Sequence, residues 1–395
     1  MLPALLIDVD DTLLDTDIER FLPAYLQRLG QHLNHLVPSE PMIAALMRGA
    51  KAMLDNLGPL KTLHQAFGEI YYPTLHTTED ALRPALEAFY RDHFPDLRHQ
   101  TRPRPQARAL IAHAFASGTD GVIATNPLFP RTAIEQRLTW AEIPASEYPY
   151  ALITHYENMH FAKPRPEYLA EVLGLLARSP IEAAMIGNNP ADDLGPARLL
   201  GMAVFHVGEP PSRYPHSDLT QARLWLSLAS SQTDPQAAAS PPALLAMLRG
   251  DLAALHTLST RLEPAAWHRR PAADVLAPAE ILCHLRDVEV DVNLPRLEAI
   301  LGSTEPFFHA VDTDRWIEQR GYLQQDGMAA LMAFGAARQQ LVAQLDSLEL
   351  EAWERRARHA LLGPTTLAEM VRVITDHDRL HLAALRASLP QPRLD

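Results

Sequence analysis

The sequence contains a single cysteine, Cys283, in 395 residues, so an internal disulfide is excluded. This scarcity is typical of a reducing compartment, and we expect a cytoplasmic protein. No apolar run is long enough to span a bilayer, and the first residues lack a signal-like segment, so we expect no membrane partner. The formal net charge of −13 argues against nucleic acid as a partner.

The apolar pattern of the first half alternates between short runs and helical spacing. Short apolar runs occur at residues 5–7, 121–124, 150–154, 183–186 and 202–207. Helical patterns separate them, which predicts an α/β fold with a Rossmann-like, doubly wound parallel sheet. Residues 16–102 are almost entirely helical in pattern. Because they follow the first strand directly, we expect them to form an inserted helical cap over the strand ends.

The second half has a different character. Residues 209–242 are rich in proline, serine and alanine, which predicts a tether around a helix at 219–228. Beyond it, helical patterns cover residues 243–262, 278–300, 331–348 and 365–387. The length favours two or three domains. We therefore expect a first domain at 1–230, a linker at 231–242 and a separate all-α four-helix bundle at 243–390.

Acidic residues follow the first strand at once. Asp8, Asp10 and Asp11 come directly after the apolar run, with Thr12 beside them. Ligands of open α/β sheets bind at the carboxyl ends of the strands. Of two neighbouring carboxylates at such a strand end, one can attack an electrophile and the next can transfer a proton. Carboxylates this close repel one another, so we expect a cation among them. The alternative is an Asp-rich turn without chemistry.

Polar residues at later strand ends favour a site over a plain turn. Residues 1 to about 210 resemble the haloacid dehalogenase superfamily of hydrolases, because polar motifs of that superfamily follow one another in the same order along the chain, each at a predicted strand end. The resemblance rests on four motifs: Asp8-Val9-Asp10-Asp11-Thr12-Leu13, Thr125, Lys163-Pro164-Arg165-Pro166, and residues 187–193. The helical insertion also falls where many members of that superfamily carry a cap.

The resemblance implies a phosphatase mechanism. Asp8 would attack phosphorus and form an aspartyl-phosphate. Asp10 would protonate the leaving oxygen and then deprotonate water, and its presence favours phosphate esters over organohalides. Thr125, Asn126 and the neighbouring amides would bind the phosphoryl oxygens. Lys163 would neutralise the charge of Asp8 and the phosphate.

The resemblance also implies a Mg²⁺ ion. Its ligands would be the Asp8 carboxylate, the Asp10 backbone carbonyl and the fourth motif, through Asn188 and Asp193. The fourth motif departs from the family pattern, because Asn188 stands where an aspartate is usual. Two outcomes stay open: weaker Mg²⁺ binding with a larger share for Asp193, or an impaired enzyme.

Histidines in the predicted bundle suggest a second site. His377 and His381 are four residues apart, so both rings can reach one metal ion from one helix face. His284 lies in an earlier predicted helix. Three histidines with open coordination positions suit Zn²⁺, Ni²⁺ or Fe²⁺. The alternative is a surface pair and a core histidine. Nearby carboxylates are expected to accept hydrogen bonds from the ring N–H groups, namely Asp287, Asp376 and Asp378.

Residues about 243 to 390 resemble the DinB-like (YfiT-type) helical-bundle superfamily. The segments that carry this resemblance are 279–289 and 376–381, together with Trp267, Arg270-Pro271, Trp316, Tyr322 and Trp353. It implies a divalent metal bound by the three histidines. It also implies thiol-dependent transfers or hydrolyses, hence a low-molecular-weight thiol as a partner.

Three hypotheses follow for the whole chain. In the first, the protein is a phosphatase of a small phosphorylated metabolite with an added metal-binding bundle. In the second, the bundle is the active partner, as a metal-dependent thiol transferase or hydrolase, and the first domain is weak or regulatory. In the third, both domains are sensors or assembly modules. The sequence does not indicate the oligomeric state or the individual substrate.

Overall fold

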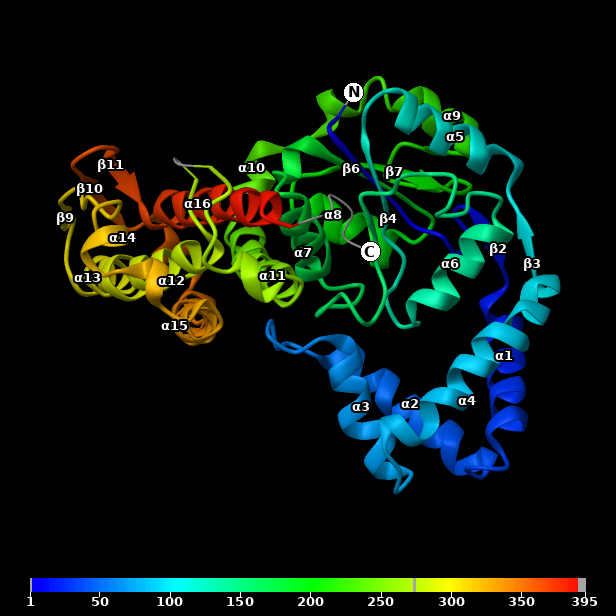
Figure 1. The fold of residues 1–395 in the computed structure, drawn as a ribbon. Helices are drawn as coiled ribbons and strands as arrows, with labels where there is room; N and C mark the ends of the chain where they lie inside the picture. The colour runs from blue at the N-terminus through cyan, green and yellow to red at the C-terminus, as the bar shows by residue number, and fades with distance from the viewer. Residues whose placement is uncertain (1, 273–274, 390–395) are drawn as a thin grey trace.

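The computed structural model describes residues 2–272 and 275–389. Its first half is built on a parallel sheet of six strands in the order β5-β4-β1-β6-β7-β8. This confirms the predicted doubly wound sheet (Figure 1). The strands are β1 (Ala4–Ile7), β4 (Asp120–Ile123), β5 (Leu152–Ile153), β6 (Ala183–Gly187), β7 (Ala203–Val207) and β8 (His216–Ser217).

Helices cover both faces of this sheet. Side chains alternate along a strand, so Ala4 and Leu6 of β1 belong to one hydrophobic cluster and Leu5 and Ile7 to another. The first cluster includes side chains of α7 (Pro166–Leu176) and α8 (Gly195–Leu199). The second includes side chains of α5 (Pro105–Ala116), α6 (Arg131–Trp140) and α9 (Leu219–Trp225).

The cap is inserted through a two-stranded ribbon. Strand β2 (Leu14–Thr16) pairs antiparallel with β3 (Thr101–Pro103), and the cap helices lie between them in the chain. Phe21, Tyr25 and Phe94 pack edge to face in its interior, as aromatic pairs prefer. The cap consists of α1 (Ile18–Leu33), α2 (Ser39–Asp55), α3 (Leu63–Thr74), α4 (Glu79–Asp92) and the 3₁₀ segment η1 (Phe94–Gln100).

The segment predicted as a tether folds against the first half. It contains β8, α9, the 3₁₀ turn η4 (Ala229–Gln232) and α10 (Pro235–Ala238). The backbone N–H of Asp234 donates to the Gly201 carbonyl at 2.8 Å, and Arg198 donates to the Gln232 carbonyl at 2.8 Å. These bonds fasten residues 232–234 to the end of α8.

The second half is a helical bundle, shown at the yellow-to-red end of the chain in Figure 1. A π-turn, η6, separates α12 from α13 within the single helix predicted at 278–300. A three-stranded sheet in the order β11-β10-β9 was not predicted. The main helices are α11 (Pro241–Thr260), α12 (Pro278–Val288), α13 (Leu294–Gly302), α15 (Gly327–Asp346) and α16 (Leu367–Ala387), and η6 spans Glu289–Asn293. The short ones are η2 (Pro180–Glu182) in the first half and η5 (Pro264–Ala266), β9 (Phe307–Phe308), α14 (Trp316–Gln319), η7 (Tyr322–Gln324), η8 (Leu350–Glu354), β10 (Arg356–His359) and β11 (Gly363–Thr366).

The two halves share a hydrophobic core along α7 and α11. One continuous cluster of buried side chains contains residues of the sheet, α7, α11, α15 and α16. The two helices approach closely at glycines, since a Cβ on Gly250 would lie 2.5 Å from the Glu171 nitrogen and one on Gly174 would lie 2.9 Å from the Ala254 Cβ. No helix among the described residues is both long and apolar enough to cross a membrane.

Candidate functional sites

The first site lies at the carboxyl ends of the three central strands. Strand β1 lies between β4 and β6 in the sheet. Asp8 follows β1 directly, Thr125 follows β4, and Asp193 lies in the π-turn η3 (Pro190–Leu194) after β6. Lys163 precedes α7 and reaches the same edge. All four residues are buried. Neighbouring parallel strands end at one edge, which explains how residues far apart in the chain meet there.

Lys163 joins two carboxylates. Its Nζ donates to Asp8 Oδ1 at 2.8 Å and to Asp193 Oδ1 at 2.5 Å, and the lysine side chain is only 3% exposed. Burial acts to lower the pKa of Lys163, but the charges of Asp193 and Asp8 outweigh it and raise the pKa above its ordinary value. Burial raises the pKa of Asp193 to about 6 against the opposing charge of Lys163. The ammonium ion is therefore a fixed positive charge between the carboxylates.

The second oxygen of Asp8 faces Thr12 and the fourth motif. The Thr12 hydroxyl donates to Asp8 Oδ2 at 2.9 Å and lies 3.4 Å from Asn188 Oδ1. The backbone N–H of Asn189 donates to Asp193 Oδ2 at 3.1 Å. Glycine is required before Asn188, because a Cβ on Gly187 would lie 2.3 Å from Asp193 Oδ2. Thr12 thus connects the first motif to the fourth.

These oxygens form a donor set that suits a hard cation. Carboxylate and amide oxygens are the ligands that Mg²⁺ prefers. The side-chain oxygens of Asp8 and Asn188 both lie close to the Thr12 hydroxyl. Asp193 and Asp8 both accept a hydrogen bond from Lys163. The residues at this edge therefore fit Mg²⁺, although the amide of Asn188 brings no charge.

Thr125 is positioned by its backbone. Its carbonyl accepts from the Tyr168 hydroxyl at 2.8 Å and from the Thr154 hydroxyl at 2.9 Å. The sequence did not identify Tyr168 or Thr154 as part of this site. Next to them, Asn126 Oδ1 is buried and has no hydrogen-bond partner among the described residues. The side chains of Thr125 and Asn126 do not hydrogen-bond to Asp8 or Lys163.

Among the described residues, no hydrogen bond joins Asp10 to the Asp8 network, and its side chain contacts a residue that the sequence did not predict. Its side chain is 31% exposed and forms an ion pair with Arg137 of α6, whose side chain is 2% exposed. Arginine on a predicted helix is usually a surface residue, so nothing in the spacing marked Arg137. Burial lowers the pKa of Arg137 to about 10, and the charge of Asp8 opposes this shift.

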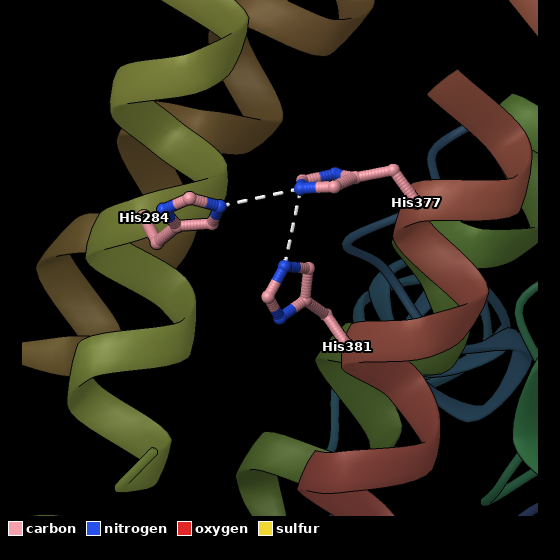
Figure 2. Close-up of side chains that lie close together, drawn as sticks. All are labelled: His284, His377 and His381. Atoms are coloured by element: carbon pink, nitrogen blue, oxygen red, sulfur yellow. Dashed lines mark hydrogen bonds between the residues drawn. The ribbon is translucent and has the colours of Figure 1, made fainter. Parts of the chain in front are cut away.

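The second site is the convergence of three histidines in the bundle. His284 comes from α12, and His377 and His381 come from α16 (Figure 2). Their candidate ligand atoms all lie within 4.8 Å of one another. Nε2 of His377 is 3.2 Å from Nε2 of both His284 and His381. Two nitrogens bound tetrahedrally at about 2.0–2.1 Å to one zinc ion lie roughly 3.3 Å apart, so the rings fit a metal ion.

The surroundings of the rings favour the form that a metal binds. Burial lowers the pKa of His284 to about 4 and that of His381 to about 2, and it also lowers the pKa of His377. Neutral imidazole is the ligand form, so no proton has to be displaced near neutral pH. His284 Nδ1 is buried without a hydrogen-bond partner among the described residues.

The carboxylates expected to orient the rings bind other groups. Asp287 accepts from Arg286, Arg320 and Tyr322. Asp376 is exposed. Asp378 accepts from Arg338 at 2.6 Å. Among the described residues, no hydrogen bond joins these carboxylates to the histidine rings as predicted, because arginines occupy the oxygens of Asp287 and Asp378 and Asp376 is exposed to solvent.

A buried arginine lies beside the three histidines instead. Arg338 of α15 is 1% exposed and donates to Glu289 at 2.5 Å as well as to Asp378. Glu289 begins the π-turn after α12, and Asp378 adjoins His377 on α16. Arg338 thus ties together the two helices that carry the histidines.

Comparison with known proteins separates the chain into the same two parts. A family model described as haloacid dehalogenase-like hydrolase matches residues 2–201, and one described as DinB superfamily matches residues 247–385. No curated protein matches the chain.

Solved structures resemble each part at low identity. A HAD phosphatase from Thermococcus onnurineus is 15% identical with a TM-score of 0.37, and the match covers 59% of this chain and 100% of that one. A 2-haloacid dehalogenase from Pseudomonas syringae pv. Tomato DC3000 is 22% identical with a TM-score of 0.39, covering 58% and 99%. YfiT from Bacillus subtilis, described as a probable metal-dependent hydrolase, is 15% identical with a TM-score of 0.35, covering 38% and 85%.

Proposed function

The chain belongs to the haloacid dehalogenase-like hydrolase family and continues into a DinB-superfamily bundle, and we propose that its first half is a Mg²⁺-dependent phosphatase of small phosphomonoesters. The observation that carries this proposal is Lys163, which lies between Asp8 and Asp193 at the strand ends. A fixed cation beside a buried carboxylate is what a phosphoryl group needs next to a nucleophile. Asp10 adds a carboxylate that can move a proton, which favours a phosphate ester over an organohalide.

In the proposed mechanism, Asp8 attacks phosphorus and becomes an aspartyl-phosphate. Asp10 exchanges a proton, first with the leaving oxygen and then with water. The ammonium of Lys163 offsets the charge of Asp8 and of the phosphoryl oxygens, and Thr125 and Asn126 orient those oxygens. Mg²⁺, held by Asp8, Asn188, Asp193 and the Asp10 backbone carbonyl, would supply positive charge to the phosphoryl group.

The test is hydrolysis of a chromogenic aryl phosphate with Mg²⁺ present. Asp8→Asn removes the nucleophile with little change of shape, so the rate should fall by at least ~10³-fold. Asp96→Asn, an exposed cap carboxylate, is the control and should keep the wild-type rate. Equal rates for wild type and Asp8→Asn would overturn the proposal. Halide release from a 2-haloacid without phosphate release would replace it with dehalogenation.

For the second half we propose a divalent transition metal, Zn²⁺, Ni²⁺ or Fe²⁺, bound by His284, His377 and His381. The support is the 3.2 Å spacing of their Nε2 atoms. Metal analysis of the purified protein should find about one ion per chain in wild type and in the control His268→Ala, an exposed bundle histidine. His377→Ala and His381→Ala should each reduce it. Unchanged metal content in both variants would show that the site is wrong.

The activity of the bundle is a second candidate function. Three protein ligands leave coordination positions free for a substrate, as in catalytic zinc sites. We propose a thiol-dependent transfer or a hydrolysis there, with a low-molecular-weight thiol as one partner. We also propose the limits 1–230 and 243–390 for the two domains, with 231–242 between them, and a cytoplasmic location from the single cysteine.

A further inference from the structure

A pocket of about 290 Å³ lies where the cap, the sheet-containing core and the bundle meet. The cap contributes Thr62, the N-cap residue of α3. The core contributes Arg131 of α6 and residues of the loop after β5, and the bundle contributes residues of α11 and its C-terminal end. Every described residue that lines the pocket is polar, whereas most small-molecule sites are largely apolar. None of the residues assigned to the two candidate sites lines it, so it is separate from both.

The pocket carries more positive than negative charge. Among the described residues that line it, Arg131 and Arg261 bring guanidinium groups and only Glu157 brings a carboxylate, although the whole chain has a formal net charge of −13. The Glu157 carboxylate already accepts from the Arg131 backbone N–H at 3.1 Å and from His155 Nδ1 at 2.6 Å. Guanidinium groups present several donors in a geometry that matches carboxylate and phosphate. The lining therefore favours an anion.

His155 brings an unpaired ring nitrogen to the pocket wall. The residue is only 5% exposed, and its Nδ1 is the donor to Glu157 because an ionised carboxylate only accepts. Its Nε2 is buried and has no hydrogen-bond partner within residues 2–272 and 275–389. A buried polar atom without a partner is costly. Its place in the wall of a polar pocket therefore indicates a ligand group that hydrogen-bonds to it.

Two threonine hydroxyls from α11 offer further acceptors. Thr257 directs its hydroxyl proton to the Asn158 carbonyl at 3.4 Å, and Thr260 directs its own to the Thr257 carbonyl at 3.0 Å. Both hydroxyls are thus used as donors, and their oxygens keep lone pairs that can accept. Hydroxyl groups of a ligand are suitable donors to them.

His256 of α11 adds an acceptor through a chain of two rings. His160 Nδ1 donates to the buried Glu171 carboxylate at 2.7 Å, and His160 Nε2 lies 2.8 Å from His256 Nδ1. When both rings are neutral, His256 Nδ1 is the donor in this second contact and its Nε2 is left as an acceptor. Burial, together with the neighbouring His160, lowers the pKa of His256 to about 4, so this ring is neutral near pH 7.

We propose that this pocket binds a small hydroxylated anion, either a hydroxycarboxylate or the phosphate ester of a small polyol. Arg131 and Arg261 attract its anionic group, and the acceptor atoms of His155, His256 and Thr260 receive its hydroxyl protons. The residues from α11 complete a site that the first half does not form without the bundle. The binding uses no step of the phosphatase reaction proposed above, so either proposal can fail without the other.

Isothermal titration calorimetry of the full chain tests this binding. All titrations use an Asp8→Asn background without Mg²⁺, so that no phosphate ester is consumed. Glycerate and glycerol 3-phosphate are the anionic probes, and glycerol is the uncharged one. At least one of the two anions should bind at one site per chain with a Kd below ~1 mM, while glycerol shows no saturable binding up to ~10 mM. The anion that binds more tightly shows whether the site is made for a carboxylate or for a phosphate ester.

Variants of the pocket locate the bound anion. Arg261→Met removes a charged donor and should raise the Kd by ~10-fold or more. Thr260→Val, at an exposed position, removes one acceptor and should raise the Kd by ~3-fold or more. Arg269→Met, an exposed arginine of the same half, is the control and should keep the Kd. Circular dichroism verifies that each variant is folded.

Three results would overturn the proposal: no binding of either anion up to ~10 mM, glycerol binding as tightly as the anions, or a Kd that Arg261→Met and Thr260→Val both leave unchanged. The last result would mean that the anion binds elsewhere, for instance beside Lys163. Failure of the phosphatase proposal is distinguishable, because it appears as aryl phosphate hydrolysis that survives Asp8→Asn and not as a change in these binding constants.

Discussion

Gly250→Ala tests whether the two halves form one packed unit. Gly250 lies in the middle of α11, where an added Cβ would lie 2.5 Å from the Glu171 nitrogen and 2.7 Å from the Ala170 carbonyl carbon of α7. Both are backbone atoms, so one helix has to move as a whole. Overpacking of this kind costs ~1–3 kcal/mol or more. The better helix propensity of alanine returns ~1 kcal/mol. We therefore expect a net loss of up to ~2 kcal/mol in the free energy of unfolding.

The control is Gly302→Ala at the end of α13, where the added Cβ meets no atom within 4 Å. This variant gains helix propensity without a clash, so it should be as stable as wild type or up to ~1 kcal/mol more stable. Urea unfolding followed by circular dichroism measures both differences. A Gly250→Ala protein as stable as Gly302→Ala would refute a close contact between α7 and α11.

Three further predictions concern single residues. Arg338→Met leaves the carboxylates of Glu289 and Asp378 buried without their cation, so the free energy of unfolding should fall by ~3–5 kcal/mol. Urea unfolding measures this loss, and Arg372→Met, at an exposed position on α16, is the control. Asn188→Asp restores a charge beside the proposed Mg²⁺ site and should lower the Mg²⁺ concentration for half-maximal hydrolysis; an unchanged or higher value contradicts this. Burial lowers the pKa of His256 to about 4 from 6.5, so the folded state resists a proton that the unfolded state accepts. Stability should therefore be lost as pH falls from about 6.5 to about 4, and His256→Gln should reduce that loss in urea midpoints at pH 7 and pH 5.

The strand-end residues of the first site could be predicted because their signals are local. The apolar run of β1 stops abruptly at Asp8, and parallel strands end at one edge, so Thr125 and Asp193 follow from the same rule. The His377–His381 pair was visible for a similar reason, since a four-residue spacing defines one helix face. Such patterns need no knowledge of which elements pack together.

Residues that depend on packing between distant elements could not be predicted. Arg137 and Arg338 read as ordinary surface arginines, and only the fold shows that each faces carboxylates in the interior. The glycines at the α7–α11 contact gave a weak signal. Gly174 and Gly250 lie inside helical patterns, where glycine is unfavourable, and such glycines often mark a close approach of backbones. The sequence alone did not say which helix would approach.

One loop connects the bundle to the first site. Within residues 155–163, the Met159 carbonyl accepts from the Leu63 N–H of the cap at 2.8 Å, and His160 Nε2 lies 2.8 Å from His256 Nδ1 of the bundle. The same loop ends at Lys163, which joins the two carboxylates of the site. Cap, core and bundle therefore all contact the segment that carries the central cation. In the phosphatase proposed above, a misplaced charge would weaken catalysis steeply, so the contact between the bundle and this loop would help to hold Lys163 in place.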